Sequence, residues 1–191
     1  MITLSENLML YHGSYTEVSV IDLRKCSEGL DFGKGFYVTS SQKQAISYVP
    51  SSVRKAKRRE VVPKSFDESD GRISIYRYHM ASDLSIHYFE DADAEWLHYA
   101  ACNRSKVLFP ELRKKYATVD IISGKVADDV TAVTLNNYVA GAYGVPGTVQ
   151  ADRIAIELLE PERLTDQFCF RTARAIRTLE FLRSDRYGDI I

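Results

Sequence analysis

The chain has 191 residues, of which 45% are hydrophobic, and its formal net charge is −1. Domains usually contain roughly 100–200 residues, so this length predicts one domain over residues 1–191, with enough apolar side chains for a core. A net charge near zero gives no bulk attraction to nucleic acid or to an anionic membrane.

The sequence also bears on where the protein works. The cysteines Cys26, Cys102 and Cys169 are odd in number and have neither metal-ligand nor redox-motif spacing, which favours reduced thiols in the cytosol. The first residues, MITLSENLML, lack the basic region and apolar run of a secretory signal. No segment approaches the roughly 20 apolar residues of a membrane-spanning helix. We therefore expect a cytoplasmic protein without a membrane partner.

Two strands and a helix are predicted in the first fifty residues. Leu8–His12 is an apolar strand, and Asp31–Thr39 is a second strand that begins with two glycines. Ser40 or Ser41 caps the next helix, which Pro50 is expected to end or kink.

A basic stretch, Val53–Lys64, follows this helix and contains six lysines and arginines. Charge of this density is typical of a solvated helix or loop, which is the reading we favour. The alternative is a surface that contacts an acidic partner or nucleic acid.

The remainder of the chain mixes strands and helices in an irregular order, which predicts an α+β fold. The expected strands are Arg72–Met80, Leu84–Phe89, Val119–Ser123 and Gln167–Phe170. The expected helices are a segment from Asp91 or Asp93 to Asn103, then Asp128–Ala140, Thr148–Leu159 and a terminal helix Ala173–Arg183 capped by Thr172.

Three short motifs stand out because of their spacing. The pair His12-Gly13 ends the first predicted strand. The second strand contains Gly33-Lys34-Gly35-Phe36-Tyr37, and Tyr48 follows Tyr37 by eleven residues on the predicted helix. This arrangement resembles the NAD-binding half of the ADP-ribosyltransferases, in the branch of diphtheria toxin and poly(ADP-ribose) polymerase. The resemblance implies an ADP-ribosyltransferase-like split β-sheet core with flanking helices.

The resemblance extends over nearly the whole chain. A small bacterial family of that superfamily, formerly of unknown function (the DUF3990-like proteins), combines four blocks in the same order. These blocks match Asp31–Tyr37, Glu95–Arg104, Asp120–Asp129 and Asp166–Gln167.

Membership implies a transferase that consumes NAD as its substrate and modifies a macromolecule, protein or nucleic acid, inside the cell. Such proteins are often toxins encoded beside a small neutralising partner. A non-catalytic NAD-binding module, an NAD glycohydrolase and a pure interaction domain remain as alternatives.

The resemblance also implies a role for individual residues. His12 would hydrogen-bond a ribose hydroxyl, and Gly13 would present its backbone to the nicotinamide carboxamide. Tyr37 and Tyr48 would enclose the flat nicotinamide ring, while Gln44 would contact its carboxamide. Considered singly, a histidine at a strand end or a tyrosine on a strand is more often structural, and the chain has twelve tyrosines.

The catalytic position usually held by a glutamate matches Gln167 here. A glutamine amide accepts a hydrogen bond from a ribose hydroxyl but lacks the negative charge and basicity of a carboxylate. The predicted catalytic residues are thus His12, Tyr37 and Gln167. The predicted cofactor-binding residues are Tyr11, His12, Gly13, Ser14, Gly35, Phe36, Tyr37, Gln44, Tyr48 and Arg104.

Two further readings concern Arg104 and metals. Arg104 would contact the NAD diphosphate or, equally, interact with the C-terminus of its own helix. The other histidines, His79, His87 and His98, have no metal-ligand spacing, so no metal is expected.

Overall fold

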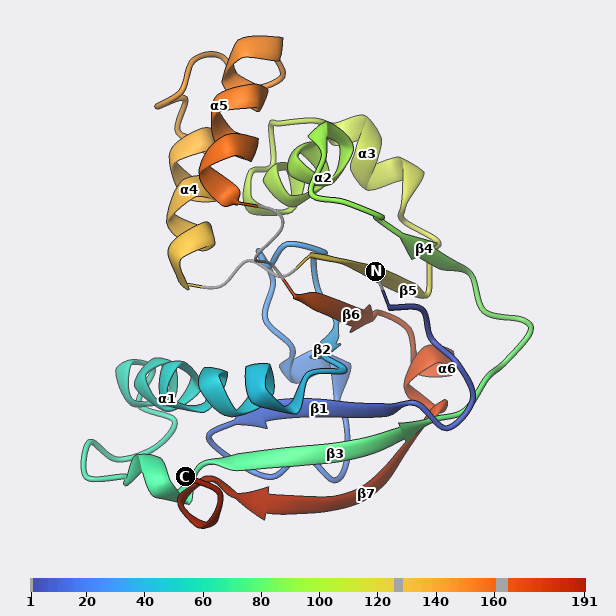
Figure 1. Cartoon of the computed structure of the whole chain (residues 1–191), viewed down its shortest axis with the longest axis vertical. Helices are drawn as coiled ribbons and strands as arrows, with labels where there is room; N and C mark the ends of the chain where they lie inside the picture. The colour runs from blue at the N-terminus through green and yellow to red at the C-terminus, as the bar shows by residue number, and fades with distance from the viewer. Residues whose placement is uncertain (1, 126–128, 161–164) are drawn as a thin grey trace.

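The structure is a computed structural model that describes residues 2–125, 129–160 and 165–191. These residues form a mixed α+β fold with two β-sheets and six α-helices (Figure 1). In chain order the elements are β1 (Met9–Ser14), β2 (Phe36–Val38), α1 (Gln42–Arg58), β3 (Arg72–Tyr78), β4 (Ile86–Tyr88), α2 (Ala94–Arg104), α3 (Pro110–Lys115), β5 (Ile121–Lys125), α4 (Asp129–Val139), α5 (Val149–Leu159), β6 (Asp166–Phe170), α6 (Ala173–Ile176) and β7 (Leu179–Arg186).

The two sheets meet at one edge of each. The first has the order β1-β3-β7 and is antiparallel, whereas the second has the order β2-β6-β5-β4 with β4 and β5 parallel. A single bridge joins them: Tyr11 and Thr39 exchange two backbone hydrogen bonds of 2.8 and 3.0 Å. Beyond this bridge β1 and β2 are no longer paired, so the sheets separate there.

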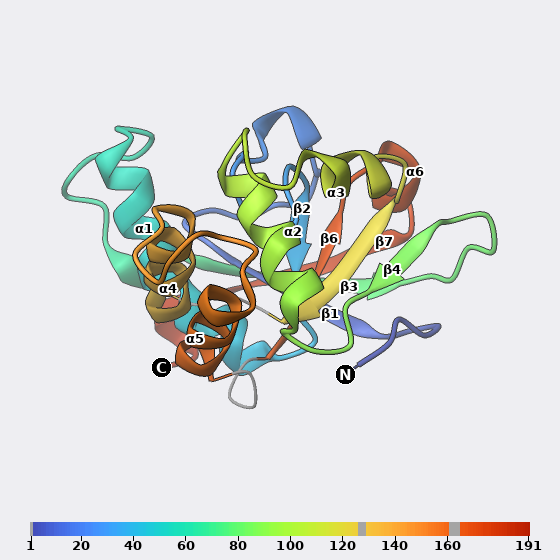
Figure 2. The ribbon, with the colours of Figure 1, turned by 90° about the horizontal axis from the view of Figure 1, so that it is seen from above.

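The sheets enclose one core and carry helices on their outer faces. Leu10, Tyr76 and Phe168 lie in the core between them. On the outer face of the first sheet, Val49 of α1 packs on Ile73. Helices α2, α4 and α5 cover the outer face of the second sheet, and Figure 2 shows α4 and α5 beside α2. The molecule is therefore layered as helix, sheet, sheet and helices.

Helix α1 starts where the sequence predicts, because the Ser41 hydroxyl accepts a hydrogen bond from the Gln44 amide at 3.3 Å. Of the two effects expected of Pro50, ending the helix is wrong, since the helix continues to Arg58. Val53 and Ala56 bury their side chains beyond the proline, and this packing offsets the missing N–H.

Two other predictions are corrected. The predicted strand Asp31–Thr39 is mostly loop, and only Phe36–Val38 pairs as β2. The predicted terminal helix Ala173–Arg183 is wrong: α6 ends at Ile176, and β7 then pairs with β3. Leu179 and Phe181 fit a strand packed on the core as well as a helix face, and the free edge of β3 selects the strand. The predicted helix start at Asp128 lies outside the described residues.

Candidate functional site at the junction of the two sheets

The backbone of Gly13 points toward the gap between the sheets. Tyr11 directs both its N–H and its C=O to Thr39. Alternate residues of a strand direct these groups to the same side, so those of Gly13 face the second sheet as well. A continued ladder would pair Gly13 with Tyr37, but the Tyr37 carbonyl instead contacts the imidazole of His12 at 2.8 Å. The side chain of His12 thus takes the place of a pairing between Gly13 and Tyr37, and in the part of the chain that the structure describes β2 offers no partner to the Gly13 amide and carbonyl.

Only glycine fits at position 13. An added Cβ would lie 2.0 Å from the carbonyl oxygen of Ala45 and 3.3 Å from Val49, both on α1. The glycine therefore lets α1 pack directly on β1. This close contact also fixes the first turns of α1 beside the gap between the sheets.

His12 is held in one tautomer. A carbonyl oxygen only accepts hydrogen bonds, so the contact with Tyr37 requires the proton on Nδ1 of His12. Burial lowers the pKa of His12, and this outweighs the opposing effect of the Tyr37 carbonyl. The ring also packs on Phe36, with centroids 4.6 Å apart. At neutral pH the imidazole is neutral, and Nε2 is a hydrogen-bond acceptor.

Tyr37 is fixed through its hydroxyl group. This group donates to the Gly33 carbonyl at 2.7 Å and accepts from the Phe32 amide at 3.0 Å. Burial, together with the nearby Cys169 and Asp31, raises the pKa of Tyr37 well above its ordinary value. The tyrosine thus stays neutral, and its ring is held half-buried beside Phe32 at the edge of the outer layer.

The loop before β2 is held by the end of α2. The buried carboxylate of Asp31 accepts hydrogen bonds from Arg104 at 2.6 and 3.0 Å, and Asn103 donates to the Asp31 carbonyl at 2.9 Å. Gly33 has a left-handed backbone (φ +78°), and an added Cβ would meet the Asn103 amide oxygen at 2.9 Å. Arg104 also donates to Asn136 of α4 at 2.9 Å. These contacts set the position of the loop and hence of Tyr37.

A threonine that the sequence analysis did not single out links three elements at this junction. The Thr39 hydroxyl lies 2.6 Å from Oε1 of Gln44 on α1 and 3.0 Å from the Asp166 carbonyl on β6. The amide of Ser41 also donates to this hydroxyl, at 3.1 Å. Thr39 thereby holds Gln44 over the start of β6.

Gln167 lies on the same face of the second sheet as Tyr37. It pairs with Gly124, whose missing Cβ would meet Phe32, the residue stacked on Tyr37. Gln167 is buried, with 7% of its surface exposed, and its amide nitrogen donates to the Lys125 carbonyl at 3.4 Å.

Tyr48 lies one helical turn beyond Gln44 and is 44% exposed. Its ring contacts Lys55, whose Nζ is 4.9 Å from the ring centroid and 3.3 Å from the hydroxyl oxygen. Within the described residues no ring contact joins Tyr48 to Tyr37.

The predicted residues fall into two groups. The structure gathers five of them at the junction, on β1, β2, β6 and the start of α1: His12, Gly13, Tyr37, Gln44 and Gln167. Tyr48 is not brought to them, because the contacts of its side chain are with Lys55 of the same helix. Tyr11 forms the bridge, and its side chain packs under α1.

The second group has structural surroundings instead. Phe36 points into the core between the sheets, and Ser14 is buried at the end of β1. An added Cβ on Gly35 would meet Cys169 Sγ at 2.4 Å, so this glycine allows close packing on β6. Arg104 binds Asp31 and Asn136. Thr39 and Asn103 act as positioning residues that were not predicted, although Asn103 lies in one of the four blocks.

Two further observations concern metals and membranes. No three histidine, cysteine, aspartate or glutamate side chains among the described residues are grouped so that they could hold a metal ion. Across residues 2–125, 129–160 and 165–191, no helix combines the length and the apolar character needed to cross a bilayer.

The site thus belongs to a mixed α+β protein whose two sheets meet at one bridge, beside one histidine and one glycine. Comparison with protein families places residues 8–181 in a family described as "Protein of unknown function (DUF3990)", and the chain belongs to that family. No curated protein matches the chain, and no solved structure matches it.

Proposed function

We propose that this protein is an NAD-dependent ADP-ribosyltransferase that modifies a macromolecule in the cytoplasm. The observation that supports this most is the end of the pairing between β1 and β2. There, Gly13 directs a backbone donor and acceptor toward β2, next to the neutral His12 imidazole that contacts the Tyr37 backbone. A carboxamide needs one acceptor and one donor, and Gly13 supplies this pair from one residue.

The proposed reaction breaks the bond between nicotinamide and the ribose C1 atom. Nicotinamide leaves with the bonding electron pair, positive charge develops on the ribose, and a nucleophilic atom of the acceptor bonds to C1 and gives up its proton. Such a reaction is accelerated by groups that hold the ribose and exclude competing geometries.

His12 and Gln167 suit the ribose. Nε2 of His12 is an acceptor at neutral pH, as explained above, and a ribose hydroxyl is its natural donor. The amide nitrogen of Gln167 is used by Lys125, so the amide oxygen is the group that would accept from a second hydroxyl. Tyr37 offers its ring face to the nicotinamide while its hydroxyl remains bound to the loop.

Gln167 also favours a second candidate function. Because an amide cannot stabilise positive charge as a carboxylate does, the site could bind NAD and turn it over slowly or not at all. This reading makes the protein an NAD-binding module. A glycohydrolase, in which water is the acceptor, lies between the two. The family expectation of a small neutralising partner applies to the transferase.

The test is to measure nicotinamide release from NAD by the purified protein, with and without cell extract, together with NAD binding by calorimetry. We expect release with extract, and a loss of at least a hundredfold in the variant His12→Ala. Lys114→Ala, an exposed residue of α3, is the control and should leave release unchanged.

Gln167→Glu separates the two candidates. If the wild-type protein binds NAD without turnover and Gln167→Glu starts hydrolysis, the protein is the binding module. If neither protein binds or consumes NAD, both candidates are wrong.

A further inference from the structure

Helix α1 concentrates positive charge that the net charge of the chain conceals. Residues 32–59 contain seven lysines and arginines and no aspartate or glutamate, whereas the whole chain has a net charge of −1. Five of the seven lie between Arg54 and Arg59, at the end of α1. At 1.5 Å per residue this cluster extends over about 8 Å of helix axis, before the length of the side chains is added.

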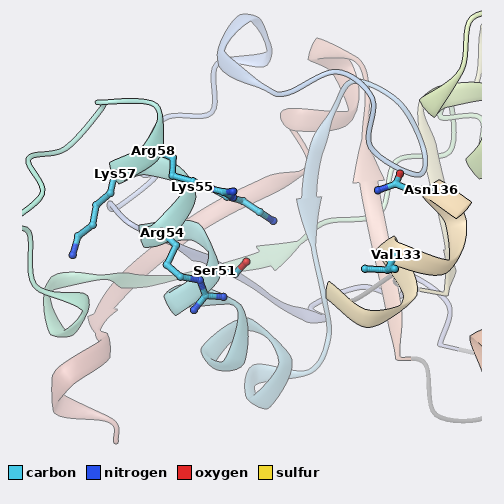
Figure 3. Close-up of a pocket in the computed structure, with 7 residues that line it drawn as sticks. All are labelled: Ser51, Arg54, Lys55, Lys57, Arg58, Val133 and Asn136. Atoms are coloured by element: carbon cyan, nitrogen blue, oxygen red, sulfur yellow. The ribbon is translucent and has the colours of Figure 1, made fainter.

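These cations border a groove between α1 and α4 of about 780 Å³. The groove is lined by Ser51, Arg54, Lys55, Lys57, Arg58, Val133 and Asn136 (Figure 3). Lys55 and Arg58 extend from α1 toward the side of the groove formed by α4, from which Asn136 and Val133 face them. Two long cationic side chains, Lys55 and Arg58, therefore face one exposed apolar side chain and one amide, and Arg54 and Lys57 also line the groove.

An exposed aromatic ring lies on the same stripe of α1. Tyr48, Lys55 and Arg58 are separated by seven and three residues, so they follow one face of the helix. Lys55 contacts the Tyr48 ring. Aromatic rings interleaved with cations are the arrangement by which proteins hold single-stranded nucleic acid, since bases stack on rings and phosphates bind cations.

The groove is connected to the candidate site by direct contacts. Asn136, on its α4 side, accepts a hydrogen bond from Arg104, and Arg104 binds Asp31 of the loop that positions Tyr37. On its α1 side, the stripe begins with Gln44 at the junction of the sheets and continues through Tyr48. An extended ligand bound along the groove would therefore reach the junction of the sheets.

We propose that this groove binds the phosphate backbone of a single-stranded nucleic acid and presents a nucleotide at the junction of the sheets. As an assignment of the acceptor, this rests on the proposed transferase function. A base or sugar atom would then form the bond to ribose C1 as nicotinamide leaves with its electron pair, and the acceptor's proton would pass to solvent.

Charge and shape favour this occupant over an acidic protein segment. Carboxylate side chains would bind the cations but would offer no flat surface to the Tyr48 ring, which is 44% exposed, and no apolar surface to Val133, which is 57% exposed. The diphosphate of NAD fits the groove less well than a single strand does, because its two phosphate groups would contact only part of a cluster of five cations.

The experiment measures binding of a fluorescent 12-nucleotide single strand, as RNA and separately as DNA, by anisotropy at 50–200 mM salt. The test variant is Arg54→Gln/Arg58→Gln. The matched control is Lys114→Gln/Arg177→Gln, which removes two exposed charges from α3 and from the residue after α6. Thermal unfolding checks the fold of each variant, and Arg58→Gln alone replaces the double variant if that fails to fold.

We expect the test variant to bind at least tenfold more weakly at 100 mM salt. Its salt dependence should be lower by about 1.4 in the slope of log K against log salt, since each single-strand phosphate contact contributes about 0.7. The control should bind like the wild type. The nucleic acid that binds more tightly, RNA or DNA, is then identified as the ligand of the groove.

Other outcomes overturn the proposal. It is wrong if the wild type binds neither strand at 50 mM salt, if the test variant binds as tightly as the control, or if a poly-glutamate peptide binds and the nucleic acids do not. Nicotinamide release without nucleic acid is measured in parallel and should be unchanged in the test variant. If nicotinamide is released but the single strand does not bind, the assignment of the groove is wrong and the transferase function stands. If the single strand binds but NAD is not consumed, the transferase function is wrong and nucleic-acid binding by the groove stands.

Discussion

The two halves of helix α1 differ in what surrounds them. The first half is fixed by close contacts: Ala45 lies against Gly13 of β1, and Gln44 is held by Thr39. The second half presents lysines and arginines to an open groove. The properties of α1 beside the junction thus depend on close packing, and those beside the groove depend on charge. Changes in the first half should act at any salt concentration, whereas those in the second should act mainly at low salt.

Gly13→Ala should have the largest effect on the first half. The new Cβ would lie 2.0 Å from a backbone oxygen of α1, so the helix must move. We expect a loss of about 4 kcal/mol in the free energy of unfolding, above the usual cost of overpacking. Urea denaturation at low and high salt measures it. Gly29→Ala is the matched control: its Cβ meets nothing within 4 Å, and only the left-handed backbone (φ +74°) costs about 1–2 kcal/mol. Equal losses in the two variants would contradict the packing argument.

Arg104→Gln tests whether the loop before β2 depends on its ion pair. The variant leaves the buried carboxylate of Asp31 without its cation, at a cost of about 3 kcal/mol. Nicotinamide release should fall by more than the loss of folded protein explains, because Tyr37 is attached to this loop. Arg174→Gln is the control, since it removes the cation paired with the carboxylate of Asp120, which is also buried and lies just before β5, at the end far from the junction. That variant should lose stability without a specific loss of release.

Thr39→Val should have a smaller effect. The valine keeps the shape but removes the hydroxyl that holds Gln44 and contacts the Asp166 carbonyl, and we expect a loss of about 1.5 kcal/mol. Chemical denaturation measures this loss, and NAD binding by calorimetry should weaken in parallel. Thr16→Val, at an exposed position, is the control and should change neither quantity. If NAD binding is unchanged in Thr39→Val, the position of Gln44 does not matter for NAD binding.

The smallest effect should be a pH dependence from His12. Its folded pKa is lowered, so the unfolded chain takes up a proton first as the pH falls below about 6.5. The contribution of His12 to stability is therefore complete above that pH and is lost as the pH falls toward the folded pKa. NAD binding should weaken in the same window, because protonated Nε2 cannot accept. Calorimetry at pH 7.5 and 5.5 measures this, and a wild type that binds better at pH 5.5 would refute the acceptor role.

The sequence predicts well what depends on near neighbours. The helix cap at Thr172 is confirmed, and the structure selects Ser41 over Ser40 and Asp93 over Asp91, because a cap depends on residues three positions apart. The contact between His12 and the Tyr37 carbonyl joins two of the motifs on which the resemblance rests.

Features set by distant residues could not be predicted. β7 was predicted as helix because Leu179 and Phe181 suit either state until the edge of β3 is known. Helix α3 has six residues, too few for a periodic pattern, and begins at Pro110. The contact of Asn103 and Arg104 with Asp31 joins two blocks that are far apart in the chain, and neither block indicates the other.

The place of β6 and β7 in the sheets has a consequence for synthesis. β6 lies between β2 and β5, and its Phe170 pairs with Phe36 from the opposite end of the chain. A nascent chain therefore cannot complete either sheet before residues 166–186 have left the ribosome. β1 can pair with β3, and β4 with β5, but β2 must wait for β6. The junction where we propose that NAD binds is therefore completed last. A partner that binds the unfinished chain would do so before the protein could act on the cell.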